Sequence, residues 1–394
     1  MMKLHTLFII LISVLVLSAC HDDPVDEVST TPRKTIIVYM AAENSLYGVV
    51  QDDLNEMKIG AAELPQEQQI IVFLDNRQNP RIYRIDRNGM ETVKEYTEDF
   101  YSTDSTMMEH VLKDIFTTYP AQSYGMVLWS HGSGWVPAVG TVRATQPRSF
   151  GIDNGHNTSS NSGQEMEIHT LAHILSHHPH LEFILFDACL MQSIEVAYEL
   201  KDVTDYIIGS PAETPGPGAP YHKILPAMFS HPADISNIVN EYFSYYENSY
   251  GMLISAIRTS KLEALANLVH QYLSPLCNNR TSLSTEDIQA YYAFHKNTGY
   301  KPEYFDMNDI MKHHLPEQAY AAWLPALEEA VPYRRATSRW LTSFSSVNPY
   351  IKDLSVYGGI TMYIPNEKYT YLNLNTALHA YKWYKAAGWD TTGW

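Results

Sequence analysis

Cysteine and positive charge are both scarce in this chain of 394 residues. Its three cysteines, Cys20, Cys189 and Cys277, are too few for a disulfide framework. We expect Cys277 to be a buried, unreactive thiol, as most free cysteines are. The 27 lysines and arginines face 44 acidic residues, which gives a formal net charge of −17. That balance argues against nucleic acid as a partner and against electrostatic binding to anionic lipid.

The chain also lacks a hydrophobic run that is long enough to span a bilayer. The apolar stretch Thr6 to Leu17 is too short for a mature transmembrane helix and reads as a targeting segment. The residues Leu17-Ser18-Ala19-Cys20 that follow resemble a bacterial lipobox, which implies cleavage after residue 19 and lipidation of Cys20. We therefore expect a lipoprotein signal peptide over 1–19, a flexible tether over 20–33, and a lipid anchor in a bacterial cell envelope, periplasmic or displayed at the outer membrane.

Several catalytic and metal-binding motifs are missing. No Gly-x-Ser-x-Gly elbow surrounds a serine, no His-Glu-x-x-His pair is present, and no EF-hand ligand run occurs. His169, His173 and His177 recur on one helix face, but the apolar residues between them define the opposite, buried face, so we expect these histidines to face solvent. The sequence predicts no metal site.

Two apolar stretches near the middle of the chain carry the main functional hypothesis. Leu181–Asp187 is an almost continuous apolar run, typical of a strand buried on both faces, and Cys189 follows it. Ser123–Trp129 has the same form, and His131 follows it. If these strands are parallel neighbours, the two side chains share one cleft at the carboxyl edge of the sheet. A thiol and an imidazole together are the minimal set for nucleophilic catalysis by cysteine. A helical pattern after Cys189 predicts a helix amino terminus that favours thiolate.

Strands alternating with helices predict an α/β fold with a mostly parallel sheet. Further strands are expected at 35–40, 69–75, 204–210, 251–257 and 355–365, with a hairpin around Asn88-Gly89. The polar stretch 136–165 is expected to be a long loop at the cleft mouth, and the proline-rich stretch 211–220 a wall of the cleft. From about residue 280 short helices dominate, which suggests a core over 34–280 and a mainly helical region with a late strand over 281–394.

Two motifs stand at the ends of these two strands: Ser130-His131-Gly132-Ser133-Gly134-Trp135 and Phe186-Asp187-Ala188-Cys189-Leu190-Met191. They resemble the two catalytic motifs of clostripain-type cysteine peptidases, which are relatives of the caspases, gingipains and legumains. The resemblance extends from about residue 35 to 365. It implies a caspase-like α/β/α sandwich, with Cys189 as nucleophile and His131 as general acid/base. The amides of Gly132 and Cys189 would then form the oxyanion hole.

Substrate preference is less well specified by the sequence. The resemblance suggests Asp187 as a residue that holds a basic substrate side chain, and strand alternation would aim Asp187 and Cys189 to the same side. Glu213 is the only carboxylate of the proline-rich wall and the other candidate. Cleavage after Arg or Lys and a neutral specificity pocket both remain open. Arg143 and Arg148 are candidate self-cleavage sites, and a calcium requirement, which some relatives have, is unresolved.

The sequence thus predicts a lipid-anchored cysteine endopeptidase, which we expect to act as a monomer on peptide or protein substrates. The alternative is a surface lipoprotein that uses the same fold as a non-catalytic binding module for peptides or glycans. Slow alkylation of Cys189, no faster than that of Cys277, would favour the binding module.

Overall fold

The structure, a computed structural model, describes residues 32–136, 150–155, 163–291, 304–340 and 349–394. Contacts between residues group Thr31–Trp394 into one compact unit. Within the described ranges, no helix combines the length and the apolar character needed to cross a membrane.

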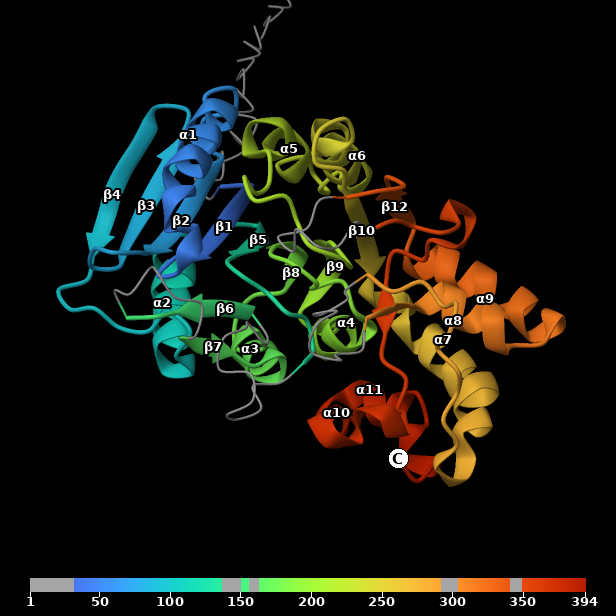
Figure 1. Cartoon of the computed structure of the whole chain (residues 1–394). Coiled ribbons are helices and arrows are strands. Elements are labelled where there is room, and N and C mark those ends of the chain that lie inside the picture. The colour runs from blue at the N-terminus through green and yellow to red at the C-terminus, as the bar shows by residue number, and fades with distance from the viewer. Residues whose placement is uncertain (1–31, 137–149, 156–162, 292–303, 341–348) are drawn as a thin grey trace, which may run out of the picture. The chain divides into compact units, whose positions relative to one another are not determined.

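A nine-stranded sheet forms the centre of this unit (Figure 1), in the order β12-β10-β9-β8-β5-β1-β2-β3-β4. The five strands β9, β8, β5, β1 and β2 are parallel, and the two outer strands on each side are antiparallel. The expected mostly parallel sheet is therefore found at the centre. The strands are β1 Lys34–Ala41, β2 Gln69–Asp75, β3 Arg81–Asp86, β4 Gly89–Glu95, β5 Ser123–Trp129, β8 Leu181–Asp187, β9 Thr204–Gly209, β10 Leu253–Arg258 and β12 Tyr333–Ala336.

Both faces of the sheet are buried, and strand alternation divides the side chains between two cores. On β8, Ile184 and Phe186 enter one core, while Phe183 and Leu185 enter the other. The first core lies under α2 (Ser105–Thr118), α3 (Ile168–Leu175), α4 (Ile194–Leu200) and α7 (Leu262–Leu268). The second lies under α1 (Val50–Ala61), α5 (Tyr221–Met228) and α6 (Ile235–Tyr246) (Figure 1). Burial on both faces explains why the strands are almost continuously apolar.

Much of the predicted element order is present, with local differences. The hairpin of β3 and β4 turns at Asn88-Gly89 as expected, and Asn44 caps the first turn after β1 through its Oδ1 atom. The expected long loop contains a small hairpin of β6 (Phe150–Asp153) and β7 (Gln164–Met166). The predicted strand at 355–365 is wrong in length, since only β13 (Thr361–Met362) pairs, with β11 (Phe305–Asp306).

Residues 281–394 were expected to form a mainly helical region of their own. They do contain the helices α8 (Met307–His314), α9 (Glu317–Ala330), α10 (Leu374–Ala377) and α11 (Lys382–Ala386). They also supply β12, which pairs with β10 in the central sheet. Trp323, Trp383 and Trp389 are fully buried and belong to the same core as α2, α3 and α4. In its packing, the C-terminal part is continuous with the rest of the unit.

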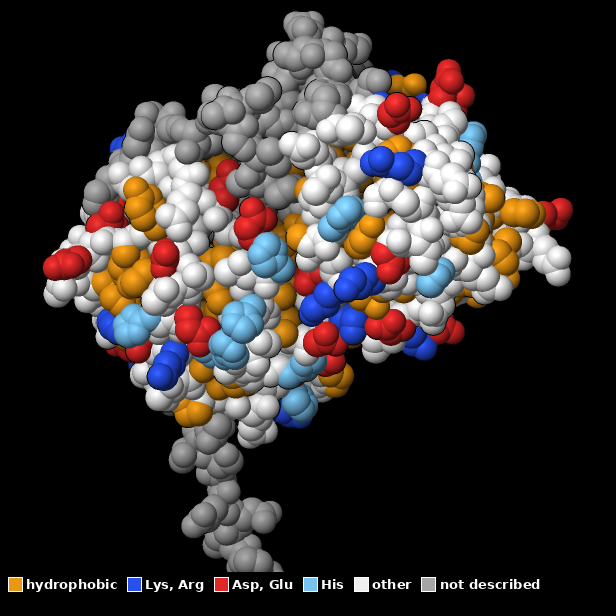
Figure 2. Space-filling model, turned by 90° about the horizontal axis from the view of Figure 1, so that it is seen from below, with side chains coloured by type: hydrophobic (Ala, Val, Ile, Leu, Met, Phe, Trp, Pro, Cys, Tyr) orange, Lys and Arg blue, Asp and Glu red, His pale blue; other side chains and the backbone are white. Residues whose placement is uncertain are grey.

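The surface mixes charges of both signs with histidines, as the face in Figure 2 shows. On α3, His169 and His173 are exposed, and His177 beyond it is exposed as well. His177 lies 3.5 Å from a carboxylate oxygen of Glu109 on α2. The solvent-facing position expected for these histidines is confirmed.

Candidate active site

The two strands that lead to His131 and Cys189 are direct neighbours. β5 and β8 pair in parallel, and their last residues, Trp129 and Asp187, are partners in the register. Ser130 extends the contact, because its amide donates to the carbonyl of Asp187 at 3.3 Å. His131 and Cys189 each follow two residues after these partners. The predicted pairing of the strands is confirmed, and it brings both residues to the same edge of the sheet.

The His-Gly-Ser-Gly loop lies directly on the backbone of the Cys189 segment. A Cβ atom at Gly132 would stand 2.8 Å from the carbonyl oxygen of Cys189, and one at Gly134 would stand 2.6 Å from that of Leu190. Gly134 has a φ of +67°, and Leu190 also adopts a positive φ, 65°, which is rare for a bulky residue. Only glycine permits this approach of the two loops. Backbone strain next to Cys189 is typical of functional sites.

His131 is half-buried, and a set of hydrogen bonds from β1 and β6 holds its position. Its Nε2 atom lies 3.0 Å from the hydroxyl of Ser45, and its carbonyl accepts from the amide of Gly151 at 3.0 Å. The hydroxyl of the preceding Ser130 is buried and donates to the carbonyl of Ala41 at 2.7 Å. The same hydroxyl accepts from the amide of Ile152 at 3.2 Å. The carboxyl end of β1 and strand β6 thus fix the loop that carries the imidazole.

Cys189 is half-buried, and its sulfur contacts Thr214 of the proline-rich wall. Both the amide and the hydroxyl of Thr214 lie 3.4 Å from Sγ. Burial raises the pKa of the Cys189 thiol to about 11, and the negative charge of Glu213 adds to the rise, whereas the hydrogen bonds from Thr214 oppose it. The thiol is therefore neutral near pH 7 in this state.

The prediction that Cys189 stands at a helix amino terminus is wrong. α4 begins at Ile194, and Ser193 is its cap, accepting from the amide of Val196 at 3.3 Å. Four residues, 190–193, separate Cys189 from the first residue of this helix, so the dipole of the helix does not lower the pKa of the thiol.

Asp187 lies on the opposite side of the sheet from Cys189, contrary to the expectation from strand alternation. Its carboxylate accepts hydrogen bonds from the amide of Ala219 at 2.9 Å and the hydroxyl of Tyr221 at 3.0 Å. The hydroxyl of Tyr242 donates to the other carboxylate oxygen at 3.3 Å. Cys189 packs against the core under α2, α3 and α4 instead. β8 ends at Asp187, and the alternation ends with it.

A second buried acid, Asp53 on α1, accompanies Asp187. The indole nitrogen of Trp129 donates to Asp53 at 2.8 Å, and Gly218 lies against both carboxylates. Burial, and next the charge of Asp187, raise the pKa of Asp53 to about 9. Burial raises the pKa of Asp187 too. The pair therefore holds a proton at neutral pH and lies directly beneath Gly218 of the proline-rich segment 211–220.

The C-terminal part of the chain supports the histidine loop from outside. The hydroxyl of Tyr304 donates to the carbonyl of Ser133, and that of Tyr381 donates to the carbonyl of Trp135 at 2.5 Å. The Trp135 side chain is fully buried, and its ring centroid lies 4.6 Å from that of Tyr363. These contacts connect residues that lie far apart in the sequence and hold the loop against the cysteine segment.

The structure brings His131, Gly132, Cys189 and Glu213 to one edge of the sheet and directs Asp187 to the other side of the sheet. Arg143, Arg148 and Cys20 lie outside the described residues. Sequence reasoning missed Ser45 and Thr214, the contacts of the imidazole and the thiol. The polar Asn44-Ser45 pair directly after a buried strand, and the position of 211–220 after β9, were the signals for them. A group of acids at the ends of β1 and β2 was also missed.

Comparisons with known proteins find relatives of this chain. A profile of the clostripain family matches residues 38–394. Clostripain of Hathewaya histolytica is 23% identical over 221 residues, which cover 49% of this chain and 41% of that protein. The aligned stretch thus spans about two fifths of that relative.

Two solved structures resemble the fold over most of the chain. A secreted C11 cysteine protease from Bacteroides thetaiotaomicron, bound to an irreversible peptide inhibitor, is 31% identical with a TM-score of 0.76. The match covers 91% of this chain and 99% of that one. An inactive zymogen C11 protease from Parabacteroides distasonis is 27% identical with the same TM-score, and the match covers 91% and 98% of the two chains.

Proposed function

Because the chain belongs to the clostripain family, we propose that it is a cysteine endopeptidase in which Cys189 is the nucleophile and His131 the general acid/base. One observation carries the assignment of the two residues. Trp129 and Asp187 are register partners, and the glycines after His131 pack onto the backbone of Cys189 and Leu190. This arrangement leaves the thiol and the imidazole at one edge of the sheet, both half-exposed.

The proposed reaction is acyl transfer through a thioester. The imidazole of His131 takes the proton of the Cys189 thiol as sulfur attacks the carbonyl carbon of the scissile bond. The C–N bond then breaks, and His131 gives the proton to the departing amine. Water next attacks the thioester, with His131 again as base, and releases the carboxylic acid and the free thiol.

The amides of Gly132 and Cys189 are proposed to stabilise the oxyanion of the tetrahedral intermediate. Among the described residues, neither amide donates to a protein acceptor, which supports this role. Two donors that are held in place lower the barrier because they need no rearrangement during the reaction.

The resting thiol is neutral, which bears on how the reaction begins. With a pKa of about 11, Cys189 carries its proton at pH 7, and its sulfur is engaged by Thr214. A substrate that enters the cleft along the wall 211–220 would displace Thr214 and free the sulfur. His131 then acts as a general base during the attack, and a preformed thiolate is not required.

For the substrate we propose a basic residue before the scissile bond. The support is the negative charge of Glu213, which acts on the Cys189 thiol, and the presence of two buried acids, Asp53 and Asp187, under Gly218 of the adjacent wall. The described hydrogen bonds of the Asp187 carboxylate come from Ala219 of the wall, Tyr221 of α5 and Tyr242 of α6, so an interaction with substrate would require the wall to move. A basic preference would also make Arg143 and Arg148 candidates for self-cleavage.

For the location we propose a bacterial cell envelope, with the mature chain anchored through lipidated Cys20. The support is the lipobox-like sequence of residues 17–20 and the apolar run before it. Labelling of growing cells with a radioactive or clickable palmitate analogue tests the anchor. A chain with Cys20→Ala that still incorporates the label would contradict it.

The substitution Cys189→Ala tests the catalytic assignment, with Cys277→Ala as the matched control. Cys277 is fully buried, outside the site, and loses the same thiol group. We expect Cys189→Ala to abolish turnover of a mixed peptide library, while Cys277→Ala retains it at a temperature where both variants are folded. Turnover by Cys189→Ala would refute the assignment. An unmodified chain that binds library peptides without cutting any of them would identify the binding module instead.

Inhibitors test the basic preference separately. A peptidyl chloromethyl ketone that ends in Lys should inactivate the enzyme faster than one that ends in Leu. The reverse order would contradict an acidic pocket and leave the cysteine mechanism in place.

A further inference from the structure

An arginine stacked on a tyrosine places a positive charge at the carboxyl ends of β1 and β2. Arg77 follows β2, and the central carbon of its guanidinium lies 3.6 Å from the centroid of the Tyr47 ring. Tyr47 belongs to the short helical turn Ser45–Gly48, which follows β1. Both side chains are exposed, Tyr47 to 39%. A guanidinium is attracted to the face of an aromatic ring, so Tyr47 gives Arg77 a preferred position on the surface.

The turn that carries Tyr47 also contacts the imidazole of the proposed site. The hydroxyl of Ser45 lies 3.0 Å from Nε2 of His131. Asn44 caps the turn, because its Oδ1 atom accepts from the backbone amide two residues later at 2.9 Å. One capped turn therefore holds both the contact of the imidazole and, two residues further on, the ring on which the guanidinium lies.

Arg77 and Glu213 lie on opposite sides of the proposed catalytic pair. In the sheet, β9, β8, β5, β1 and β2 are consecutive and parallel, so all of them end at the same edge. The segments that follow these strands therefore stand in the same order along that edge: 211–220, Cys189, His131, Ser45–Gly48 and Arg77. The edge thus carries an acid on the side of the nucleophile and a base on the side of the imidazole.

The direction of the proposed reaction decides which half of a substrate meets Arg77. The acyl half stays on the sulfur of Cys189, while the imidazole of His131 gives its proton to the departing amine. The amine half therefore extends toward the His131 side of the site, which is the side of Arg77. β5 and β2 are two strand spacings apart, about 10 Å, and an extended peptide advances about 3.3 Å per residue. Arg77 accordingly lies within reach of the second or third residue after the scissile bond.

We propose that Arg77, positioned on Tyr47, binds an acidic substrate side chain at the second or third position after the scissile bond. A guanidinium binds a carboxylate through two parallel hydrogen bonds, a geometry that suits such a contact. This inference rests on the proposed function, because the peptidase mechanism sets the direction of the substrate. It narrows the substrate class to peptides with an acidic residue shortly after the bond, in addition to the basic residue proposed before it.

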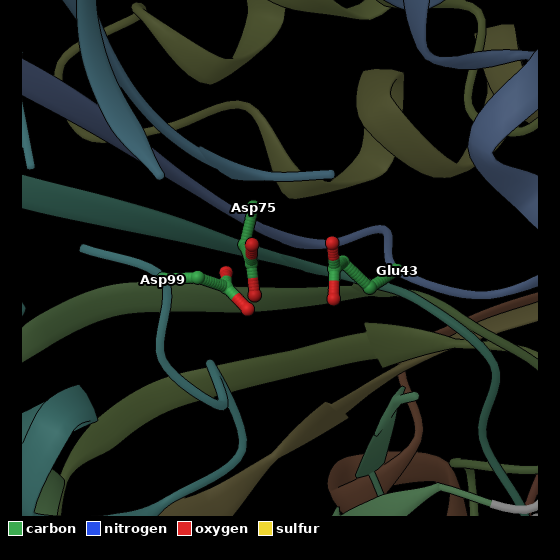
Figure 3. Close-up of side chains that lie close together, drawn as sticks. All are labelled: Glu43, Asp75 and Asp99. Atoms are coloured by element: carbon green, nitrogen blue, oxygen red, sulfur yellow. The ribbon is translucent and has the colours of Figure 1, made fainter. Parts of the chain in front are cut away.

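Three acids converge at the same strand ends, and they bear on the charge that a substrate meets. Glu43, Asp75 and Asp99 form an acid cluster, in which one carboxylate oxygen of each lies within 4.8 Å of the other two (Figure 3). Glu43 and Asp75 are fully buried. Burial, and next the charge of Asp153, raise the pKa of Asp75 to about 10, so this carboxyl is neutral near pH 7. Arg77 is exposed and is therefore the charge that a bound peptide contacts.

Paired peptide substrates test the proposal. The two peptides of a pair share the residue before the bond, taken from the best-cut library peptide. They differ only at the second or the third residue after the bond, which is Glu in one and Lys in the other, and mass spectrometry confirms the position of the cut. For the full chain we expect kcat/KM to favour Glu about three- to tenfold at low salt, as suits an exposed ion pair. The preference should shrink at about 0.5 M salt, because salt screens exposed charges.

Substitutions of Arg77 should change this ratio, which does not depend on the fraction of folded enzyme in a preparation. Arg77→Gln should bring the ratio close to one, and Arg77→Glu should reverse it in favour of Lys, a gain that misfolding cannot produce. Tyr47→Leu should reduce the ratio, whereas Tyr47→Phe retains an aromatic face and should keep most of it.

Arg87→Gln is the matched control. Arg87 is also exposed, but it lies in the turn between β3 and β4, and β3 runs antiparallel to β2. That turn is therefore at the opposite edge of the sheet, and the variant loses the same charge far from the proposed contact. We expect it to keep the ratio of the unmodified chain.

Several results would overturn the role of Arg77. They are a ratio near one in the unmodified chain, or a preference for Glu that Arg77→Glu leaves intact. Equal loss of the ratio in Arg87→Gln would assign the preference to net charge and would overturn the role too. Each of these results leaves the cysteine mechanism in place, since the peptides are still cut. A chain that cuts none of the peptides would contradict the proposed function and, with it, the role of Arg77.

Discussion

The alkylation rate of Cys189 as a function of pH tests the electrostatics of the proposed nucleophile. Only the thiolate reacts with iodoacetamide, so the rate follows the thiolate fraction. With a pKa of about 11, that fraction at pH 7.5 is about 0.03%, compared with about 3% for a thiol at its ordinary value of 9. We expect labelling about a hundredfold slower than that of an exposed thiol, rising tenfold per pH unit up to about pH 10.

Two neighbouring substitutions should move this profile in opposite directions. Glu213→Gln removes a charge that raises the pKa of the thiol, so it should speed labelling at pH 8–9. Thr214→Val removes a hydroxyl that lowers the pKa of the thiol, so it should raise that pKa further. Loss of the hydroxyl also changes the access of iodoacetamide to the sulfur. The variants are therefore compared by the midpoint of the pH profile.

Mass spectrometry of the peptide that contains Cys189 gives the rate for this residue alone. Cys277 is the internal control, since it is fully buried and burial raises its pKa to about 12. A plateau with a midpoint below about pH 8 would refute the reasoning. It would mean that a protonated His131 stabilises the thiolate in the resting enzyme.

Two further predictions concern stability. Gly132→Ala places a Cβ 2.8 Å from the carbonyl oxygen of Cys189. We expect it to lower the free energy of unfolding, measured by urea denaturation, by about 1–3 kcal/mol, and to reduce kcat for peptide hydrolysis. Unchanged stability would contradict the close approach of the two loops. For Asp53 the folded pKa of about 9 lies above the unfolded value of 3.8, so folding becomes less favourable as pH rises between the two. Asp53→Asn removes this dependence and should make the protein more stable than the unmodified chain at pH 8, with a smaller difference at pH 4; an equal difference at both pH values would count against the raised pKa.

The central strands and the placement of His131 and Cys189 at one edge of the sheet were predictable because they depend on patterns within short segments. β5 and β8 are apolar throughout, a composition that burial on both faces demands, and their ends therefore meet at one edge of a parallel sheet. The family resemblance rested on the same two strand ends and the glycines that follow. The profile match over 38–394 confirms it.

Other features depended on contacts between distant segments. The orientation of Asp187 relative to Cys189 follows from where β8 ends, and alternation cannot supply that. β12 was missed because it is short and contains Arg334 and Arg335. Its extended backbone is stabilised mainly by pairing with β10, which is distant in the sequence. Likewise, Thr214 reaches the thiol only because the wall turns back after β9.

The acid cluster was missed for the same reason. Glu43, Asp75 and Asp99 are spaced by 32 and 24 residues in the chain, so no local ligand run marks them. Their proximity follows from the pairing of β1 with β2 and from the segment that leads from β4 into α2.

The support of the histidine loop by Tyr304 and Tyr381 has a consequence for biosynthesis. The loop is complete in sequence at Trp135, yet the hydroxyl that fixes the carbonyl of Trp135 is added about 250 residues later. A nascent chain that carries both His131 and Cys189 thus still lacks the clamp that holds them together. The final position of the histidine loop is therefore reached only after ribosomes have completed nearly the entire polypeptide.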